Sequence, residues 1–191
     1  MTSNPDTNPF VRPDTRAFLD FLNAQDGPKM HELPAAVGRD MMKAMRVVGD
    51  AEPTPLAVIR DLSCPGPAGD IPLRLYDARE SREPGPVLVF FHGGGFVIGD
   101  LDTHEPFCTE AARILDIPVI AVDYRLAPEH VWPAAPDDCE AAARWIATSP
   151  AELGRSVTAL TVGGDSAGGN LAIVVAMALR DAPAAVPVIA Q

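Results

Sequence analysis

The sequence has few cysteines and no long apolar run. Its three cysteines, Cys64, Cys108 and Cys139, lie far apart and form no C-x-x-C motif. Neither a disulfide framework nor a zinc site is therefore expected, and the cysteines are predicted to be buried or semi-buried free thiols. The longest strongly apolar run, residues 171–179, has nine residues, whereas a helix needs about 20 to cross a bilayer. We expect this run to be a buried core helix.

Basic residues are also scarce. The chain has 15 lysines and arginines against 26 aspartates and glutamates, so its formal net charge is −11 at pH 7. Like-charge repulsion opposes binding to nucleic-acid phosphates and to anionic lipid, and we expect neither nucleic acid nor a membrane as a partner. The first residues lack the basic start and the apolar stretch of a signal peptide, which predicts a cytoplasmic location.

Two helices are predicted in the first 50 residues. Apolar side chains recur at helical spacing in residues 16–24 and 34–48, as in amphipathic helices. The proline-rich residues 51–55 then end the helical pattern, because a proline disfavours the helical conformation of the residue before it. A domain boundary is therefore expected after residue 52.

Strands and helices alternate in the rest of the chain. Residues 58–62 and 71–76 are predicted to form an antiparallel pair of strands, separated by a turn-rich loop over residues 64–69. The later segments alternate in type: strands are predicted at residues 87–91, 119–122, 159–162 and 186–190, and helices at residues 103–115, 136–147 and 167–180. Strands that are apolar throughout predict an α/β protein with a parallel sheet covered by helices on both faces.

A Gly-x-Ser-x-Gly motif, residues 164–168, joins one of these strands to the helix that follows it. Strand, sharp turn and helix are the context in which such a serine acts as a nucleophile. Gly164 and Gly168 make room for the turn, and the helix N-terminus supplies free N–H groups. The pattern predicts that Ser166 is a nucleophile; the alternative is a glycine-rich turn with an N-cap serine. Asp165 is expected to be a structural or cap-facing carboxylate.

A run of glycines follows the strand at residues 87–91. In His92-Gly-Gly-Gly95 the glycines let backbone N–H groups point into a cleft with no Cβ in the way, as an oxyanion hole requires. No lysine and Ser/Thr follow the run and its spacing is not G-x-G-x-x-G, which excludes a P-loop and a dinucleotide fingerprint. A merely flexible turn is the alternative.

No histidine follows Ser166. In a strand-turn-helix nucleophile motif the chain order is serine, acid, histidine. All four histidines precede the serine: His31, His92, His104 and His130. We expect structural or exposed roles for them, with His92 orienting the glycine loop. Asp181 lies about 20 Å along the helix at 1.5 Å per residue, too far to be the triad acid. The end at Gln191 is therefore expected to be a truncation, a cleavage or a chain break.

Three motifs in a fixed order resemble those of one known family. They are His92-Gly-Gly-Gly-Phe96, Asp123-Tyr-Arg-Leu-Ala-Pro-Glu-His130 and Gly164-Asp-Ser-Ala-Gly-Gly-Asn170. The sequence resembles the hormone-sensitive-lipase-like esterases of the α/β-hydrolases. The resemblance implies an α/β-hydrolase fold with a mostly parallel sheet that is incomplete in this chain. It also implies N-terminal cap helices at residues 1–52 and a hydrolase core at residues 53–191 that lacks its C-terminal part.

The resemblance also assigns roles to site residues. It implies that Ser166 is the nucleophile and that the N–H groups of Gly94, Gly95 and Ala167 form the oxyanion hole. His92 and Gly93 are expected to support the oxyanion loop, Gly93 being the less secure donor. No metal or cofactor is expected, and the triad acid and histidine are expected outside this chain.

The implied function is that of a carboxylesterase acting on small-molecule esters of short to medium acyl chains through an acyl-enzyme. An acyltransferase with the same machinery and a non-catalytic protein of the same fold that binds a small ligand are the alternatives. The expected partner is the remaining C-terminal polypeptide that completes the sheet, which in a cleaved protein would be a second fragment. A homo-oligomer is left open. Residues 1–191 alone are predicted to be inactive.

Overall fold

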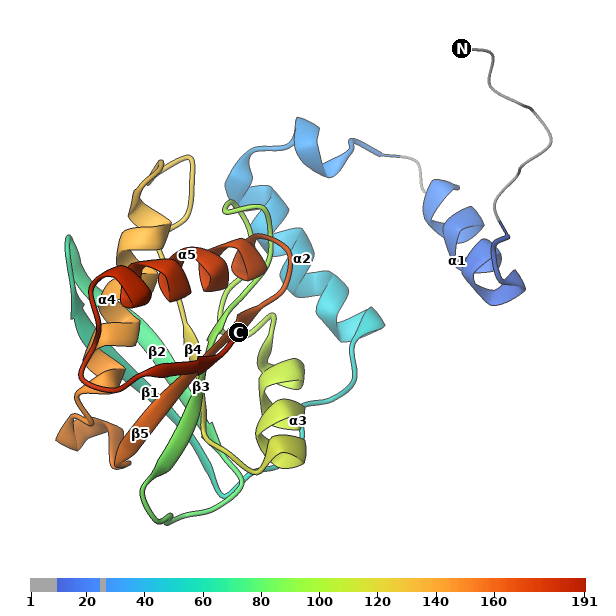
Figure 1. Cartoon of the computed structure of the whole chain (residues 1–191). Helices are drawn as coiled ribbons and strands as arrows, with labels where there is room; N and C mark the ends of the chain where they lie inside the picture. The colour runs from blue at the N-terminus through green and yellow to red at the C-terminus, as the bar shows by residue number, and fades with distance from the viewer. Residues whose placement is uncertain (1–9, 25–26) are drawn as a thin grey trace. The chain divides into compact units, whose positions relative to one another are not determined.

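The chain folds into two compact units that divide between Pro34 and Ala35. The computed structural model describes residues 10–24 and 27–191, and the side chains of residues 47 and 48 lie outside that description (Figure 1). Part of the expected cap, residues 1–9, also lies outside it. The division falls earlier than the domain boundary expected after residue 52, because the second predicted helix belongs to the larger unit. The cap role of the N-terminal helices stays a prediction.

The smaller unit contains the first predicted helix. This helix, α1 (Pro13–Asn23), begins with a proline in its first turn and is followed by the short 3₁₀ helix η1 (Met30–Glu32). Proline is tolerated at a helix start because the N–H it lacks has no intrahelical partner there. No residue of α1 is buried, and Phe18 and Leu22 are both exposed.

The second predicted helix, α2 (Ala35–Gly49), is attached to two loops of the larger unit. Arg39 donates hydrogen bonds to the carbonyl oxygen of Val97 (2.8 Å) and to that of Ala127 (2.9 Å). One turn further along, Lys43 pairs with Asp100 at 2.7 Å. These polar contacts make α2 part of the unit that carries the sheet.

A six-stranded sheet forms the centre of the larger unit (Figure 1). Its strands run in the order β1-β2-β4-β3-β5-β6. Their bounds are β1 (Val58–Gly66), β2 (Gly69–Asp77), β3 (Gly85–Phe91), β4 (Val119–Val122), β5 (Val157–Gly164) and β6 (Val188–Ala190). Strand β2 is antiparallel to both of its neighbours, and the other pairs are parallel. The predicted α/β class with a mostly parallel sheet is confirmed.

The prediction of a loop over residues 64–69 is wrong. The ladder between β1 and β2 continues through Pro65, opposite Asp70, and ends at the pair Gly66 and Gly69. Proline lacks the N–H that an inner strand needs, but β1 is an edge strand, where one side of the ladder is open. The prolines and glycines of this segment therefore mark a tight hairpin and not a long loop.

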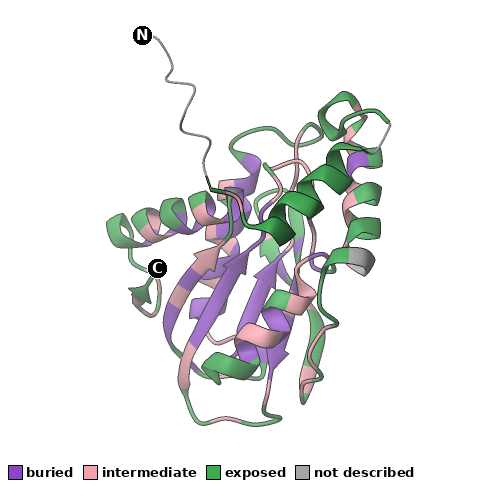
Figure 2. Cartoon of the chain, turned by 90° about the vertical axis from the view of Figure 1, so that its right-hand side faces the viewer, coloured by how far each residue is buried: buried purple, intermediate pink, exposed green. Residues whose placement is uncertain are grey.

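Helices cover both faces of the sheet, as predicted. One face packs against α3 (Glu105–Leu115) and the other against α4 (Ala134–Ala147) and α5 (Ala167–Asp181); a 3₁₀ helix, η2 (Ala151–Leu153), precedes β5. Alternate residues of β3 serve the two faces: Leu88 and Phe90 lie in the α3 cluster, Val87, Val89 and Phe91 in the other, as the two-residue period of a strand requires. Figure 2 shows the buried residues concentrated on the central strands. The three cysteines are buried and free, as predicted.

None of the helices within residues 10–24 and 27–191 combines the length and the apolar character needed to cross a bilayer.

Candidate active site

Ser166 occupies the turn between β5 and α5. Its backbone angles, φ 50° and ψ −115°, lie in a sparsely populated region that costs a non-glycine residue about 1–3 kcal/mol. A Cβ at Gly164 or at Gly168 would clash with the carbonyl oxygen of Phe91. The two glycines thus let the turn pass directly against the carboxyl end of β3, and the turn leaves Ser166 exposed.

The glycine loop, residues 93–100, leaves β3 beside this turn. Gly94 has φ 116°, and its carbonyl oxygen accepts hydrogen bonds from the N–H groups of Val97 (3.1 Å) and Ile98 (3.0 Å). The N–H groups of Gly94, Gly95 and Ala167 have no hydrogen-bond partner among the residues that the structure describes. Ala167 is the first residue of α5, where the N–H has no intrahelical acceptor. These three donors are therefore available to a ligand.

Gly93 differs from the two glycines that follow it. Its N–H donates a hydrogen bond to Asp165 Oδ1 at 2.8 Å, so it is not available to a ligand. The carboxylate of Asp165 also lies 3.3 Å from His104 Nε2. Asp165 thus links the turn that carries Ser166 to the glycine loop, which agrees with the structural role expected for this carboxylate.

His92 is buried under the glycine loop. Its Nδ1 donates to the carbonyl oxygen of Gly93 (2.7 Å), and its ring stacks on Tyr124 with the centroids 4.3 Å apart. The Tyr124 hydroxyl donates to the carbonyl oxygen of His92 at 2.6 Å. Burial lowers the pKa of His92 to about 4, so its ring is neutral at pH 7. These contacts hold the backbone at the start of the loop.

No histidine accompanies Ser166 as a base. His104 Nε2 lies 3.3 Å from the carboxylate of Asp165, His130 lies on an exposed loop, and His31 lies in η1 of the other unit. Within the described part of the chain, Ser166 Oγ makes no hydrogen bond to a histidine. A triad histidine outside this chain stays a prediction.

The sequence pattern of the α/β-hydrolase fold matches residues 88–191, more than half of the chain. The chain belongs to the α/β-hydrolase fold family. This match confirms the predicted fold class, and together with the esterase relatives described below it confirms the resemblance to the hormone-sensitive-lipase-like esterases.

Esterases are among the relatives of this α/β-hydrolase. It is 48% identical over 123 residues to esterase LipI of Mycobacterium tuberculosis, an alignment that covers 63% of the chain and 38% of LipI. It is 35% identical over 173 residues to an ethyl acetate hydrolase of Pseudomonas putida, covering 87% of the chain and 54% of that protein. The chain therefore spans well under two thirds of the length of these relatives.

Solved structures of esterases have the same fold. Ester-hydrolase EH1AB1 from the metagenome of Lake Arreo, complexed with a derivative of bipyridine phosphonate, is 40% identical with a TM-score of 0.84, covering 93% of this chain and 58% of that one. A hyperthermophilic esterase from Pyrobaculum calidifontis is 34% identical with a TM-score of 0.79, covering 92% and 56%.

A cavity of about 420 Å³ opens next to the glycine loop of this α/β-hydrolase. Its wall includes Gly95 and Asn170, which lies four residues after Ser166 in α5. The remaining lining is mostly apolar and includes Phe96, Trp132 and Val174. The cavity therefore has room and chemistry for an apolar group close to the predicted oxyanion donors.

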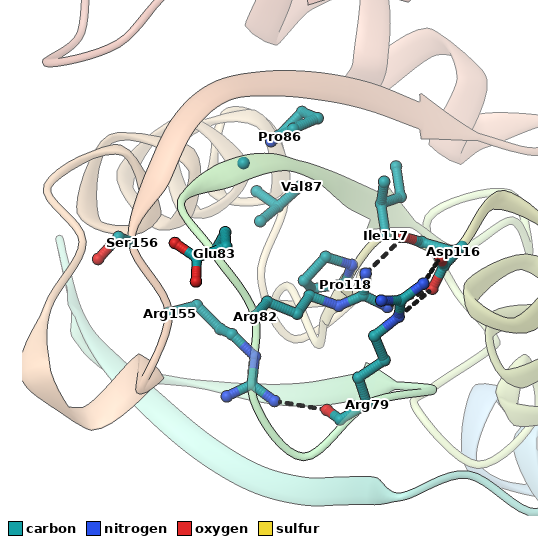
Figure 3. A pocket seen from close by; sticks show the side chains of 11 residues that line it. Arg79, Arg82, Glu83, Pro86, Val87, Asp116, Ile117, Pro118, Arg155 and Ser156 are labelled. Carbon is teal, nitrogen blue, oxygen red and sulfur yellow. Dashed lines mark hydrogen bonds and ion pairs between the residues drawn. The ribbon is translucent and has the colours of Figure 1, made fainter.

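A second cavity lies at the opposite end of the parallel strands (Figure 3). It has about 260 Å³ and is lined by residues that precede or begin β3, β4 and β5, among them Pro86, Pro118 and Ser156. Arg79 and Arg82 project into it and pair with Asp116. Because Ser166 lies at the carboxyl ends of these strands, this cavity is remote from the candidate site. No cluster of three or more metal-ligating side chains occurs among the residues described.

The pairing of Asp165 with Gly93 and His104 was not predicted. Asp165 and Gly93 are far apart in the sequence, and no periodic pattern relates them. The adjacency follows from the parallel pairing of β3 with β5, where Phe91 lies opposite Gly164. This register brings the two following loops together.

Proposed function

We propose that this chain carries the nucleophile and the oxyanion hole of a serine carboxylesterase. Ser166 Oγ attacks the ester carbonyl, and its proton passes to a histidine outside this chain. The carbonyl oxygen becomes an oxyanion, which accepts hydrogen bonds from the N–H groups of Gly94, Gly95 and Ala167. The tetrahedral intermediate collapses, the alcohol leaves with the proton, and water then hydrolyses the acyl-enzyme by the same steps.

The hydrogen bond from Gly93 N–H to Asp165 Oδ1 is the observation that carries this proposal. It supports the proposal because it holds the glycine loop beside the residue next to Ser166. The strained backbone of Ser166 and the unpaired N–H groups on both sides of it add to this support. One oxyanion donor typically contributes about 2.7–4 kcal/mol to transition-state stabilisation. His92 and Gly93 support the loop and donate no hydrogen bond to the oxyanion.

The proposed substrates are small, uncharged esters of short to medium acyl chains. The mostly apolar cavity beside Gly95 supports this class, because burying a charged group there without a partner is unfavourable. The names of the relatives, an esterase and an ethyl acetate hydrolase, agree with it. The proposed chemistry needs no cofactor.

We further propose that the triad acid and histidine lie on polypeptide that completes the sheet next to β6. A serine hydroxyl is a weak nucleophile until an aligned base takes its proton, and the part of the chain described here offers no histidine bonded to Ser166. The limited share of the relatives that this chain covers supports the same view. A homo-oligomer and a cytoplasmic location stay predictions.

The test combines covalent labelling with substitution in the protein that contains this chain. A p-nitrophenyl phosphonate should label Ser166 and no other serine, and Ser166→Ala should lower kcat for p-nitrophenyl esters by about 10⁶. Ser156→Ala, at the opposite end of β5, is the matched control and should keep full activity. Retained turnover in a clean Ser166→Ala preparation would contradict the assignment.

Two further measurements separate the proposal from its rivals. An acyltransferase would deliver the acyl group to an added alcohol or amine in preference to water. A ligand-binding protein would bind esters without turnover and would leave Ser166 unlabelled.

A further inference from the structure

Polar contacts connect both ends of the glycine loop to Asp165. At the start of the loop, Gly93 N–H donates to Asp165 Oδ1 (2.8 Å). At its end, the N–H of Asp100 donates to Thr103 Oγ1 (2.9 Å), and Thr103 Oγ1 lies 3.0 Å from His104 Nδ1. The other ring nitrogen of His104 reaches Asp165 Oδ1 at 3.3 Å. The loop is therefore closed into a ring through the residue that precedes Ser166.

The contact between Gly93 and Asp165 depends on the glycine. A Cβ at Gly93 would clash with the carboxylate of Asp165, so only glycine lets that carboxylate reach the backbone N–H. A hydrogen bond to an ionised acceptor is roughly twice as strong as one between neutral groups. The side chain of Asp165 is 55% exposed, and the ligand-facing side of the turn therefore stays open to solvent.

His104 is held rigidly where it meets Asp165. Its side chain is only 14% exposed, and its ring lies 5.5 Å from that of His92 and 6.0 Å from that of Phe90, centroid to centroid. A proton on Nε2 lets the ring donate to Asp165, while Nδ1 accepts from the Thr103 hydroxyl.

We propose that Asp165 and His104 are positioning residues that fix the glycine loop relative to Ser166. They act through Gly93 and Thr103, so that the N–H groups of Gly94 and Gly95 stay where negative charge develops on the substrate. Oxyanion donors must lie about 2.7–3.1 Å from that oxygen, and a misplacement of about 1 Å can lower the rate by about 10²-fold. This inference rests on the proposed esterase function.

The experiment compares Asp165→Ala, Asp165→Asn and His104→Ala in the full protein. The readouts are kcat, KM and the inhibition constant of a trifluoromethyl ketone, whose adduct with serine places an oxyanion in the hole. Asp165→Ala should lower kcat about 10²-fold with little change in KM, and should weaken the ketone by a similar factor. Asp165→Asn keeps an acceptor for Gly93 and should recover most of the loss. Asp181→Ala, which removes an exposed carboxylate at the end of α5, is the control.

His104→Ala should lower kcat about 10-fold. In the double variant Asp165→Ala/His104→Ala the two losses should not add, because both substitutions break the same closed set of contacts. If Asp165→Ala does not fold, His104→Ala and Asp165→Asn decide the matter. An unchanged ketone affinity in His104→Ala would overturn the proposal, and so would equal losses in Asp165→Asn and Asp165→Ala. An active wild-type protein whose Asp165→Ala variant is equally active overturns this inference alone. A wild-type protein without turnover or labelling of Ser166 overturns the esterase function and this inference with it.

Discussion

At the scale of single residues, backbone conformation separates glycines that look alike in the sequence. Gly94 has φ 116°, and a Cβ there would clash with the carbonyl oxygen of Ile98. Gly95 has φ 61°, a left-handed conformation that other residues reach at modest cost, and a Cβ there meets no atom within 4 Å. The two positions look equivalent in the sequence, but in the structure Gly94 tolerates a side chain less well than Gly95 does.

Gly94→Ala should therefore damage catalysis more than Gly95→Ala. A side chain at Gly94 forces the loop away from Ile98 and turns its N–H groups, so kcat should fall by about 10²–10³-fold with a smaller change in KM. Gly95→Ala is the matched control and should lose less. Steady-state kinetics with p-nitrophenyl esters measures both variants. An intact kcat in Gly94→Ala would mean that the loop has a purely structural role.

Asp123 is a second residue whose surroundings change its chemistry. Burial, followed by the charges of Asp100 and Asp102, raises its pKa to about 6 from the usual 3.8. Between these two pH values the folded protein binds more protons than the unfolded chain. This group therefore lowers the free energy of unfolding as pH rises through the window, and the loss persists at higher pH.

Asp123→Asn should raise the melting temperature at pH 7, and the gain should vanish near pH 4. The amide removes the charge of this partly buried side chain and keeps its shape. Thermal unfolding should compare the variant with the wild type at each pH, because His92, whose pKa is lowered to about 4, contributes a pH dependence of the opposite sign in both proteins. Asp50→Asn, at an exposed carboxylate, controls for the loss of one charge. A gain that is equal at both pH values would exclude titration of Asp123 as its cause.

At the scale of secondary-structure elements, the docking of α5 on β3 sets the position of Ser166. Gly168, in the first turn of α5, lies against the carbonyl oxygens of Phe91 and His92, where no Cβ fits. The next residue, Gly169, would place a Cβ 3.3 Å from the carbonyl oxygen of Gly164, a contact that needs only a small adjustment. Adjacent glycines of one helix thus face different constraints.

Gly168→Ala should destabilise the protein strongly, whereas Gly169→Ala should be nearly neutral. Overpacking at Gly168 should cost about 1–3 kcal/mol or more, because the added Cβ would overlap the carbonyl oxygen of Phe91, a backbone atom. At Gly169 the higher helix propensity of alanine, about 1 kcal/mol, offsets the tighter contact. Thermal unfolding of the two variants is the measurement. Equal melting temperatures would show that α5 and β3 do not pack as closely as described.

At the scale of the whole molecule, one side of the sheet is open at β6. This strand pairs with β5 on one side, and Ile189 within it is 61% exposed. On the adjoining helix α5, Ile173 and Met177 are also exposed. Unpaired strand edges with exposed apolar side chains favour association between chains.

Residues 1–191 expressed alone should therefore be poorly soluble and should show essentially no turnover of p-nitrophenyl esters. The reasons are the open edge at β6 and the lack of a base for Ser166. The full protein is the control, and sedimentation together with ester hydrolysis is the measurement. A stable monomer whose esterase activity is abolished by Ser166→Ala would contradict this prediction. His104 and His130 would then be the candidate bases.

Sequence alone determined the class of the fold and the segments that form the site. The spacing of apolar residues predicted the ends of most strands and helices to within two or three residues. It could do so because an element buried on one face, or a strand buried on both, has a characteristic apolar pattern in the local sequence. Ser166 and the glycines of its turn were readable for the same local reason, since a sharp turn between strand and helix demands small residues at fixed spacing. Prolines misled the prediction only at the hairpin of β1 and β2, where an edge position tolerates them.

Only the tertiary structure decided the contacts between distant segments. The ring that joins Gly93, Asp165 and His104, the burial that keeps His92 neutral, and the attachment of α2 through Arg39 all link residues remote in sequence. Such contacts follow from the order and register of the strands, which apolar periodicity does not specify. The proposed nucleophile Ser166 can thus be recognised from the local sequence, whereas the positions of the proposed oxyanion donors depend on the pairing of β3 with β5.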